Sequence, residues 1–433
     1  MSTEDRNTTS KDSPPLSSLL PSLILGTATF NSQYNPDPYL LPTTGIVHRA
    51  LSLGVRAFDT SPYYGPAEEL LGKALDTPFV QGNFPRRDYF LLTKVGRVGG
   101  SEFDYSAPWV RHSIQSSLER LRTGYLDVVY CHDVEFVSPE EVLTAVTELR
   151  RIRDENGTVR YVGISGYPVD VLCELSEMIL EKTGEPLDVV QSYANFTLQN
   201  TRLSSEGVAR LKAAGVDVVP NASVLGMGLL RRIGVPIGGR GDFHPSPKAL
   251  RAAIKAASDW CDEHNDRIEK VAIRFALETW MQEGQQVGSR GDPASGIPWE
   301  RETIEEIGGE KLGVSVMGVS NIEELDETMR VWRSILDGLG NGEQTAIDSG
   351  RGKDDRTWSL NRQKEVQELA KGIRQVLGSW VDFAWPSPDP GFVNTRSPWV
   401  GRPAPLPTPA ASPKHSAMKV LQVDTCERGN SRV

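Results

Sequence analysis

The sequence has few cysteines and no long apolar stretch, and both absences narrow what the chain can be. Its 433 residues include four cysteines, none in a Cys-x-x-Cys spacing. This favours reduced thiols in a cytoplasmic protein over a disulfide framework. No stretch approaches the roughly 20 apolar residues of a membrane span, and the first residues lack the apolar core of a signal peptide. We therefore expect a cytoplasmic protein with no membrane partner.

The chain also lacks an excess of positive charge and the common nucleotide and metal motifs. Its net charge of -10 disfavours a nucleic-acid partner. The six histidines are dispersed without zinc-ligand spacing, so no metal site is expected. There is no G-x-G-x-x-G motif, and the stretch at 163–167 is not a nucleophile elbow. Rossmann, zinc-hydrolase and serine-hydrolase functions are therefore unsupported.

Short β-branched runs alternate with amphipathic stretches from residue 22 onward. The candidate strands are 23–26, 57–60, 90–95, 126–133, 160–166, 188–193, 217–223 and 314–320. This repeat predicts an α/β fold whose parallel strands close into a (β/α)8 TIM barrel. A doubly wound open sheet is the alternative. The barrel is favoured because nearly every strand ends in polar residues, as at the C-terminal face of such a barrel.

Composition divides the chain into four parts. They are a disordered N-terminus (1–15), the barrel (16–340, with an inserted Gly-rich loop at 282–313), a linker with a C-terminal helix (341–385) and a Pro- and Ser-rich disordered tail (386–433). The pattern of the C-terminal helix predicts one apolar face. That face would consist of Val366, Leu369, Ile373, Val376 and Trp380.

Four chemically useful side chains follow consecutive predicted strands: Asp59, Tyr64, Lys94 and His132. Each has a structural alternative, since the aspartate could cap a turn, the lysine could be solvated, and the other two could pack. A barrel would bring all four to one mouth. Lys94 stands in an apolar strand, where an unpaired ammonium is costly, so Asp59 is its natural partner.

This set of side chains can move a proton at an oxygen atom. A free phenol has a pKa of about 10, and a cation within roughly 4–6 Å lowers it. Tyr64 beside Lys94 is therefore predicted to be a proton donor or acceptor with a lowered pKa. His132 would orient a carbonyl or hydroxyl oxygen. The set suits hydride transfer with a nicotinamide cofactor.

The four residues in this order, within "DTSPYYGPAE" (59–68), resemble the catalytic tetrad of the aldo-keto reductase superfamily. The resemblance extends from about residue 22 to 340. It implies a (β/α)8 barrel whose cofactor lies extended across the mouth. It also implies that Tyr64 is the acid/base, because the superfamily places its catalytic tyrosine directly before the glycine, here Gly65.

Further motifs resemble the D-arabinose 1-dehydrogenase (L-galactose dehydrogenase-like) branch of the superfamily. They include "TKVGR" (93–97), "LDVVYCHDVEFV" (126–137) and "NASVLGMGLL" (221–230). This likeness implies NAD(P)-dependent oxidation of an aldose, D-arabinose above all, at C1 to the 1,4-lactone, in erythroascorbate-type biosynthesis.

The resemblance also assigns residues to the cofactor. The cofactor residues would be Ser165 and Gln191 at the carboxamide, Ser223, Leu225 and Gly228 at the pyrophosphate, and Ser320, Asn321 and Glu324 at the adenosine. Asn321 stands where NADP-preferring members carry Lys or Arg, and acidic residues follow it. We therefore expect NAD, with NADP as the alternative. For the substrate pocket we expect Phe30, Tyr105 and Trp109.

Two other functions stay open. A general aldehyde or ketone reductase would use the same four residues in the opposite direction. A cofactor-sensing regulatory subunit, like the β-subunits of potassium channels, would share the fold and could bind a partner through its Pro-rich tail. The sequence alone leaves protein partners undefined.

Overall fold

The computed structural model describes residues 13–235, 241, 243–291, 310–339 and 353–396. Several expectations therefore lie wholly or partly outside the described residues. These concern the N-terminus (1–12), most of the inserted loop (292–309), the linker (340–352) and the tail beyond residue 396.

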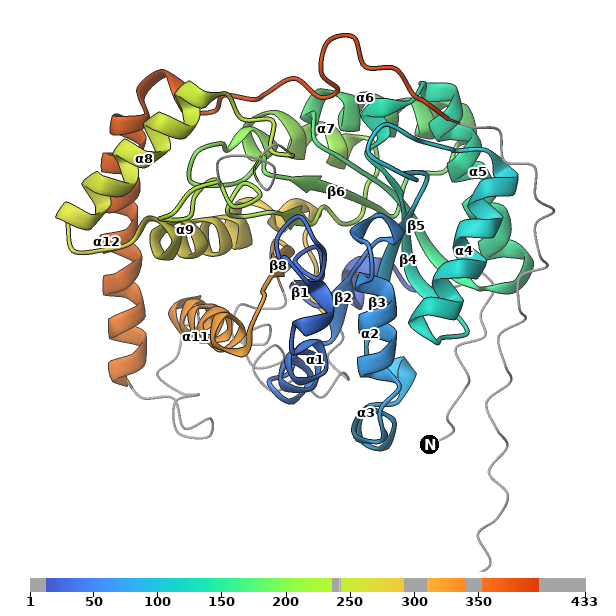
Figure 1. The fold of residues 1–433 in the computed structure, drawn as a ribbon, viewed down its shortest axis with the longest axis horizontal. Coiled ribbons are helices and arrows are strands. Elements are labelled where there is room, and N and C mark those ends of the chain that lie inside the picture. Colours follow the sequence, from blue (N-terminus) through green and yellow to red (C-terminus); the bar gives the residue numbers. More distant parts are fainter. Residues whose placement is uncertain (1–12, 236–240, 242, 292–309, 340–352, 397–433) are drawn as a thin grey trace, which may run out of the picture.

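Eight parallel strands form a closed barrel in chain order (Figure 1). They are β1 (Leu23–Gly26), β2 (Ala57–Asp59), β3 (Phe90–Val95), β4 (Leu126–His132), β5 (Val159–Gly166), β6 (Val189–Tyr193), β7 (Asn221–Ala222) and β8 (Ser315–Gly318). The last strand closes on the first, with Ile24 opposite Val316. The barrel prediction is confirmed, and the open sheet is excluded.

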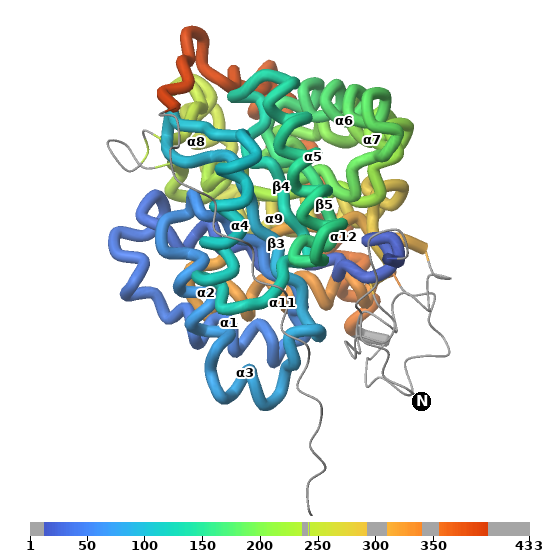
Figure 2. Tube along the Cα trace, turned by 90° about the vertical axis from the view of Figure 1, so that its right-hand side faces the viewer, coloured from blue at the N-terminus to red at the C-terminus, as the bar shows by residue number. Residues whose placement is uncertain are grey.

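Helices surround the barrel (Figure 1). They are α1 (Thr43–Ser52), α2 (Ala67–Leu75), α3 (Pro78–Asn83), α4 (Ala107–Leu121), α5 (Pro139–Asn156), α6 (Val169–Thr183), α7 (Val208–Ala213), α8 (Lys248–Glu263), α9 (Ile268–Glu283), α11 (Ile322–Leu339) and α12 (Lys353–Leu377). In Figure 2, as in Figure 1, α4 and α5 lie along the outside of β3, β4 and β5, which they contact. No helix in the described part of the chain has the length and hydropathy of a membrane span.

Helix α5 illustrates how local sequence sets these elements. The Ser138 hydroxyl accepts the N–H of Glu141, and the Glu141 carboxylate accepts the N–H of Ser138, which forms a capping box. The helix ends at Gly157, whose φ of 67° is the left-handed conformation that glycine adopts at little cost. The N-terminal Ser-x-x-Glu and the C-terminal glycine of this stretch are the residue types expected at the two ends of a helix.

Helix α12 packs against α8, α9 and α11 on one side of the barrel (Figure 1). Its buried face differs from the predicted one at the C-terminal end. Val376 is 36% exposed, whereas Leu377 is buried. The helical period carries the stripe from Ile373 to Leu377 rather than to Val376.

The chain after α12 also differs from the expectation of disorder from residue 386. Residues 386–396 run back across the barrel toward α5, as the red segment in Figure 1 shows. Phe392 packs edge-on against Phe136, with 4.9 Å between ring centroids. Asn394 exchanges two hydrogen bonds with the backbone of Phe103. Aromatic packing and these hydrogen bonds hold this Pro-rich segment against the barrel.

Candidate active site

The alternation of the barrel strands explains why the predicted catalytic residues meet. Successive side chains of a strand point to opposite faces, so residues i and i+2 share one face. Ala57, Leu92 and Tyr130 are buried together inside the barrel. Two residues after each of them come Asp59, Lys94 and His132. These three polar side chains therefore point the same way, at the C-terminal ends of β2, β3 and β4.

Lys94 and Asp59 form a buried ion pair at this mouth. The Lys94 ammonium lies 2.7 Å from Oδ1 of Asp59 and donates to the Thr60 carbonyl oxygen at 2.9 Å. Lys94 is 2% exposed and Asp59 3%. Burial raises the pKa of Asp59, and the attraction of Lys94 opposes that rise. The expected pairing is present.

Tyr64 lies over this ion pair. It ends the short 3-10 turn Pro62–Tyr64, after which Gly65 adopts a φ of 58°. The Lys94 nitrogen lies 4.9 Å from the centroid of the Tyr64 ring. Burial, followed by the negative charges of Asp59 and Asp133, raises the pKa of Tyr64 well above its usual value. The lowered pKa that we predicted for Tyr64 is therefore not found, because burial in the cavity wall disfavours the charged phenolate.

His132 is neutral and held from two sides. Its Nδ1 lies 3.1 Å from the Ser61 hydroxyl oxygen, and its Nε2 lies 3.5 Å from Oδ2 of Asp133. Burial lowers the pKa of His132 to about 3, although Asp133 opposes that effect. The ring of Tyr64 meets the imidazole edge-on, with 5.7 Å between centroids. A neutral imidazole here can donate a hydrogen bond to a substrate oxygen.

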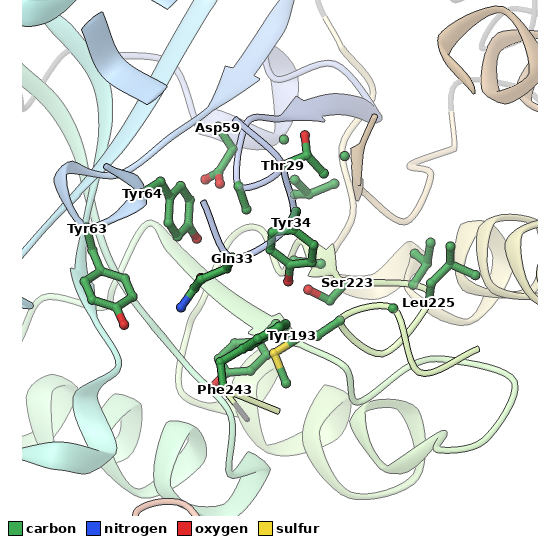
Figure 3. A pocket seen from close by; sticks show the side chains of 18 of the residues that line it. Thr29, Gln33, Tyr34, Asp59, Tyr63, Tyr64, Tyr193, Ser223, Leu225 and Phe243 are labelled. Carbon is green, nitrogen blue, oxygen red and sulfur yellow. The ribbon is translucent and has the colours of Figure 1, made fainter. Parts of the chain in front are cut away.

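All four residues line one cavity of about 880 Å³. Figure 3 shows Tyr64, Tyr34 and Ser223 with their hydroxyl groups turned toward its interior. Most of the predicted cofactor residues lie on the same cavity wall: Ser165, Gln191, Ser223, Leu225, Gly228, Ser320 and Glu324. Asn321 is not among the described lining residues. Its side chain instead caps α11 by accepting the N–H of Glu324 at 2.8 Å.

Several features of this wall fit a nicotinamide dinucleotide. Oε1 of Gln191 is buried and has no hydrogen-bond partner among the described residues, so it can accept a bond from a carboxamide N–H. The loop from Ser223 to Gly228 has positive φ at both ends, 57° and 92°. Such a loop can turn backbone N–H groups toward an anion. Arg231 lines the cavity just beyond this loop and adds a cation.

The three aromatic residues expected at the substrate do not line the cavity. Phe30 is fully buried in the hydrophobic core. Tyr105 is also buried, and its hydroxyl donates to the His132 carbonyl oxygen at 2.5 Å. Trp109 lies on α4, where its ring contacts His112. This part of the prediction is not supported, because the sequence does not show which side chains of the loops at the mouth turn inward.

Other residues line the part of the cavity that a substrate would occupy. Most of them come from segments that are distant in the sequence. Tyr34 follows β1 and meets Phe243, which follows β7, with 5.6 Å between ring centroids (Figure 3). The C-terminal segment contributes a further group of lining residues. They are Trp385, Pro386, Ser387, Asp389 and Phe392. A signal for this group was available, since large aromatic residues interrupt the Pro- and Ser-rich composition.

Known proteins resemble the chain over the barrel. The family described as "Aldo/keto reductase family" matches residues 22–338. D-arabinose 1-dehydrogenase of Saccharomyces cerevisiae is 42% identical over 267 residues, which span 61% of this chain and 77% of that protein. L-galactose dehydrogenase of Arabidopsis thaliana is 38% identical over 53% of this chain and 68% of its own. D-threo-aldose 1-dehydrogenase of a Pseudomonas species is 26% identical, covering 56% and 78% respectively.

Proposed function

Because the chain belongs to the aldo/keto reductase family and is an NAD(P)-dependent oxidoreductase acting on CH–OH groups, we propose that it oxidises an aldose at C1 to the 1,4-lactone. D-arabinose is the foremost substrate, and the lactone would enter erythroascorbate-type biosynthesis. One observation carries the proposal: Tyr64 and His132 line the same cavity as Gln191. The similarity to three aldose dehydrogenases supports the choice of substrate.

In the proposed reaction the C1 hydroxyl of the cyclic sugar lies between Tyr64 and His132. His132 donates a hydrogen bond from Nε2 to this oxygen and orients it. Tyr64 takes the hydroxyl proton while the C1 hydrogen leaves with its electron pair, so the hemiacetal carbon becomes a lactone carbonyl carbon. A nicotinamide cofactor held at Ser165 and Gln191 would supply the acceptor for that hydride, and the positive charge of its oxidised ring would favour the phenolate form of Tyr64.

The ion pair below Tyr64 would have an electrostatic role in this step. Lys94 stabilises a phenolate above it, while Asp59 keeps the ammonium in place. The cofactor carboxamide would bind at Ser165 and Gln191, because Oε1 of Gln191 has no partner among the described residues and can accept its N–H. Ser223, Leu225 and Gly228 would face the pyrophosphate, together with Arg231.

We further propose that the enzyme prefers NAD. The adenosine end of the site would lie at Ser320 and Glu324, which both line the cavity. The Glu324 carboxylate accepts the Ser320 N–H at 2.8 Å, so it is fixed in place with its negative charge. A 2′-phosphate would be repelled there, whereas a ribose hydroxyl could donate to the carboxylate.

A panel of aldoses with NAD and with NADP tests the proposal through the absorbance of the reduced cofactor. We expect saturable, NAD-linked oxidation of D-arabinose. Reduction of simple aldehydes without oxidation of any aldose would instead make the protein a general carbonyl reductase. No turnover with either substrate class, but tight cofactor binding, would favour a regulatory subunit.

A further inference from the structure

A second ion pair lies on the cavity wall next to His132. The Arg97 guanidinium donates to Oδ2 of Asp133, and another of its N–H groups donates to the Tyr63 hydroxyl oxygen at 3.1 Å. All three side chains line the cavity. Asp133 directly follows His132, and Arg97 stands three residues after Lys94. The barrel therefore places this pair at a fixed position beside the proposed reaction centre.

The position of Arg97 is set by aromatic rings. Its guanidinium carbon lies 3.9 Å from the centroid of the Tyr63 ring, 5.4 Å from that of Phe103 and 5.6 Å from that of Phe136. Such cation–π contacts fix a guanidinium without using all of its N–H groups. Some of its N–H groups accordingly have no partner among the described residues.

Asp133 also faces the cavity in a fixed way. Its φ of 56° is a left-handed conformation that aspartate tolerates better than most residues. This turn keeps a side chain that is 3% exposed beside His132 instead of pointing it into solvent. Within the described part of the chain its hydrogen bonds involve Oδ2 alone, which leaves Oδ1 able to accept another.

We propose that Arg97, Asp133 and Tyr63 form the subsite that binds the sugar hydroxyl groups next to C1, so that the site selects polyhydroxylated substrates over apolar carbonyl compounds. The proposal rests on the function proposed above and assigns its specificity. A vicinal diol offers both donors and acceptors, which match a carboxylate and a guanidinium in one cluster. An apolar substrate would displace the water bound to these charged groups and offer no hydrogen bonds in its place. Leaving charged groups without hydrogen-bond partners is unfavourable.

Aromatic rings near the charged cluster suit the remaining surface of a sugar. Phe136, Phe392 and Trp385 line the same cavity, and the centroid of the Phe136 ring lies 5.6 Å from the Arg97 guanidinium carbon. Phe136 and Phe392 meet at 82°, and Trp385 is held by parallel stacking on Tyr167 at 4.6 Å between centroids. A sugar ring carries C–H groups on its faces, so it can pack on such rings while its hydroxyl groups bind the charged cluster.

The test compares two substrates in one set of full-length variants. The variants are Arg97→Met, Tyr63→Phe and the control Arg120→Met, which breaks an ion pair with the buried Glu68 away from the cavity. Each is assayed for NAD-linked oxidation of D-arabinose and for reduction of benzaldehyde. For Arg97→Met we expect kcat/KM for D-arabinose to fall on the order of 100-fold, mainly through KM, and the ratio of the two activities to shift by a similar factor.

Tyr63→Phe keeps the aromatic ring and removes one hydroxyl group, so it should fold normally and shift the ratio in the same direction by roughly tenfold. The control should leave the ratio within about threefold of wild type. An unchanged ratio in both Arg97→Met and Tyr63→Phe would overturn the subsite. If the wild-type protein oxidises no aldose at all, the proposed function fails instead, and the two failures are thereby separated.

Discussion

The Ser61 hydroxyl oxygen lies 3.1 Å from Nδ1 of His132 and accepts the N–H of Tyr63 at the same distance. Because the oxygen already accepts that bond, its own proton can point to Nδ1. Asp133 on the other side of the ring favours a proton on Nε2. The two contacts together select the tautomer with Nε2–H, the donor that the proposed reaction requires.

Replacing Ser61 by alanine should therefore impair orientation of the substrate oxygen. We expect kcat to fall about tenfold, the loss of one buried hydrogen bond, with little change in cofactor affinity. Steady-state kinetics and fluorescence titration with NADH measure the two quantities. Ser61→Thr keeps the hydroxyl and should recover most of the rate. Equal losses in both variants would show that Ser61 serves packing alone.

Replacing Tyr64 by phenylalanine should remove the acid/base. Loss of such a group typically lowers turnover by about 10²–10⁴-fold, and we expect NADH binding to persist because the cofactor wall is untouched. Tyr130→Phe is the matched control, since its hydroxyl is buried in the barrel and has no partner among the described residues. Wild-type turnover in Tyr64→Phe would refute the assignment.

The pair of Lys94 and Asp59 should also matter for stability. Lys94→Met leaves the Asp59 carboxyl buried without its counter-charge, which typically costs about 3–5 kcal/mol of unfolding free energy. Urea unfolding followed by fluorescence measures the change. The control Lys73→Met breaks an exposed pair with Glu69 and should cost less than about 1 kcal/mol.

A second substitution sharpens that experiment. Adding Asp59→Asn to Lys94→Met removes the unpaired acid, so part of the lost stability should return. If the double variant is less stable than wild type by the full sum of both single effects, the two residues do not interact, and the interpretation of a buried ion pair is wrong.

The raised pKa of Glu135 predicts that the stability of the protein depends on pH. Its Oε1 accepts bonds from the Ser387 hydroxyl and the Tyr167 N–H. Burial and the neighbouring Asp133 raise its pKa from 4.5 to about 8. The folded protein therefore binds the proton more tightly, so this contribution to stability is complete below pH 4.5 and is lost as the pH rises through 8.

Glu135→Gln should abolish this dependence, because the amide does not titrate. Relative to wild type, the unfolding free energy of the variant should rise by a few kcal/mol between pH 5 and pH 8.5. Urea midpoints at the two pH values provide the comparison. A constant difference between the two proteins would show that Glu135 has an ordinary pKa in the folded state.

The sequence was sufficient for the strands and for the residues at their ends. Alternation within a strand is a local property, so Lys94 and His132 could be placed at the mouth before the fold was known. The residues of the loops around the cavity mouth could not be predicted in this way. The conformation of Asp133 and the contact of Arg97 with Tyr63 depend on loops that no period governs. The charged cluster could not be foreseen for that reason.

The C-terminal segment shows a second limit. Its Pro- and Ser-rich composition is typical of disorder, yet Trp385 stacks on Tyr167 and Phe392 packs on Phe136. Composition averages over a window, whereas two anchoring aromatic rings are enough to hold a short extended segment when a hydrophobic surface lies within reach. The partners of these rings are remote in sequence, so no local signal reveals them.

The part of the cavity wall that Trp385 and Phe392 form is translated after the barrel, and this order has a consequence for how the protein is made. A ribosome adds roughly 5–20 residues per second, so Trp385 and Phe392 are incorporated roughly 3–10 s after Leu339, the end of the last barrel helix. During that interval the nascent chain already contains every strand and all four proposed catalytic residues, but one side of its cavity is still missing. The cavity wall of each newly made molecule is therefore complete only after every strand and all four proposed catalytic residues have been added to the chain.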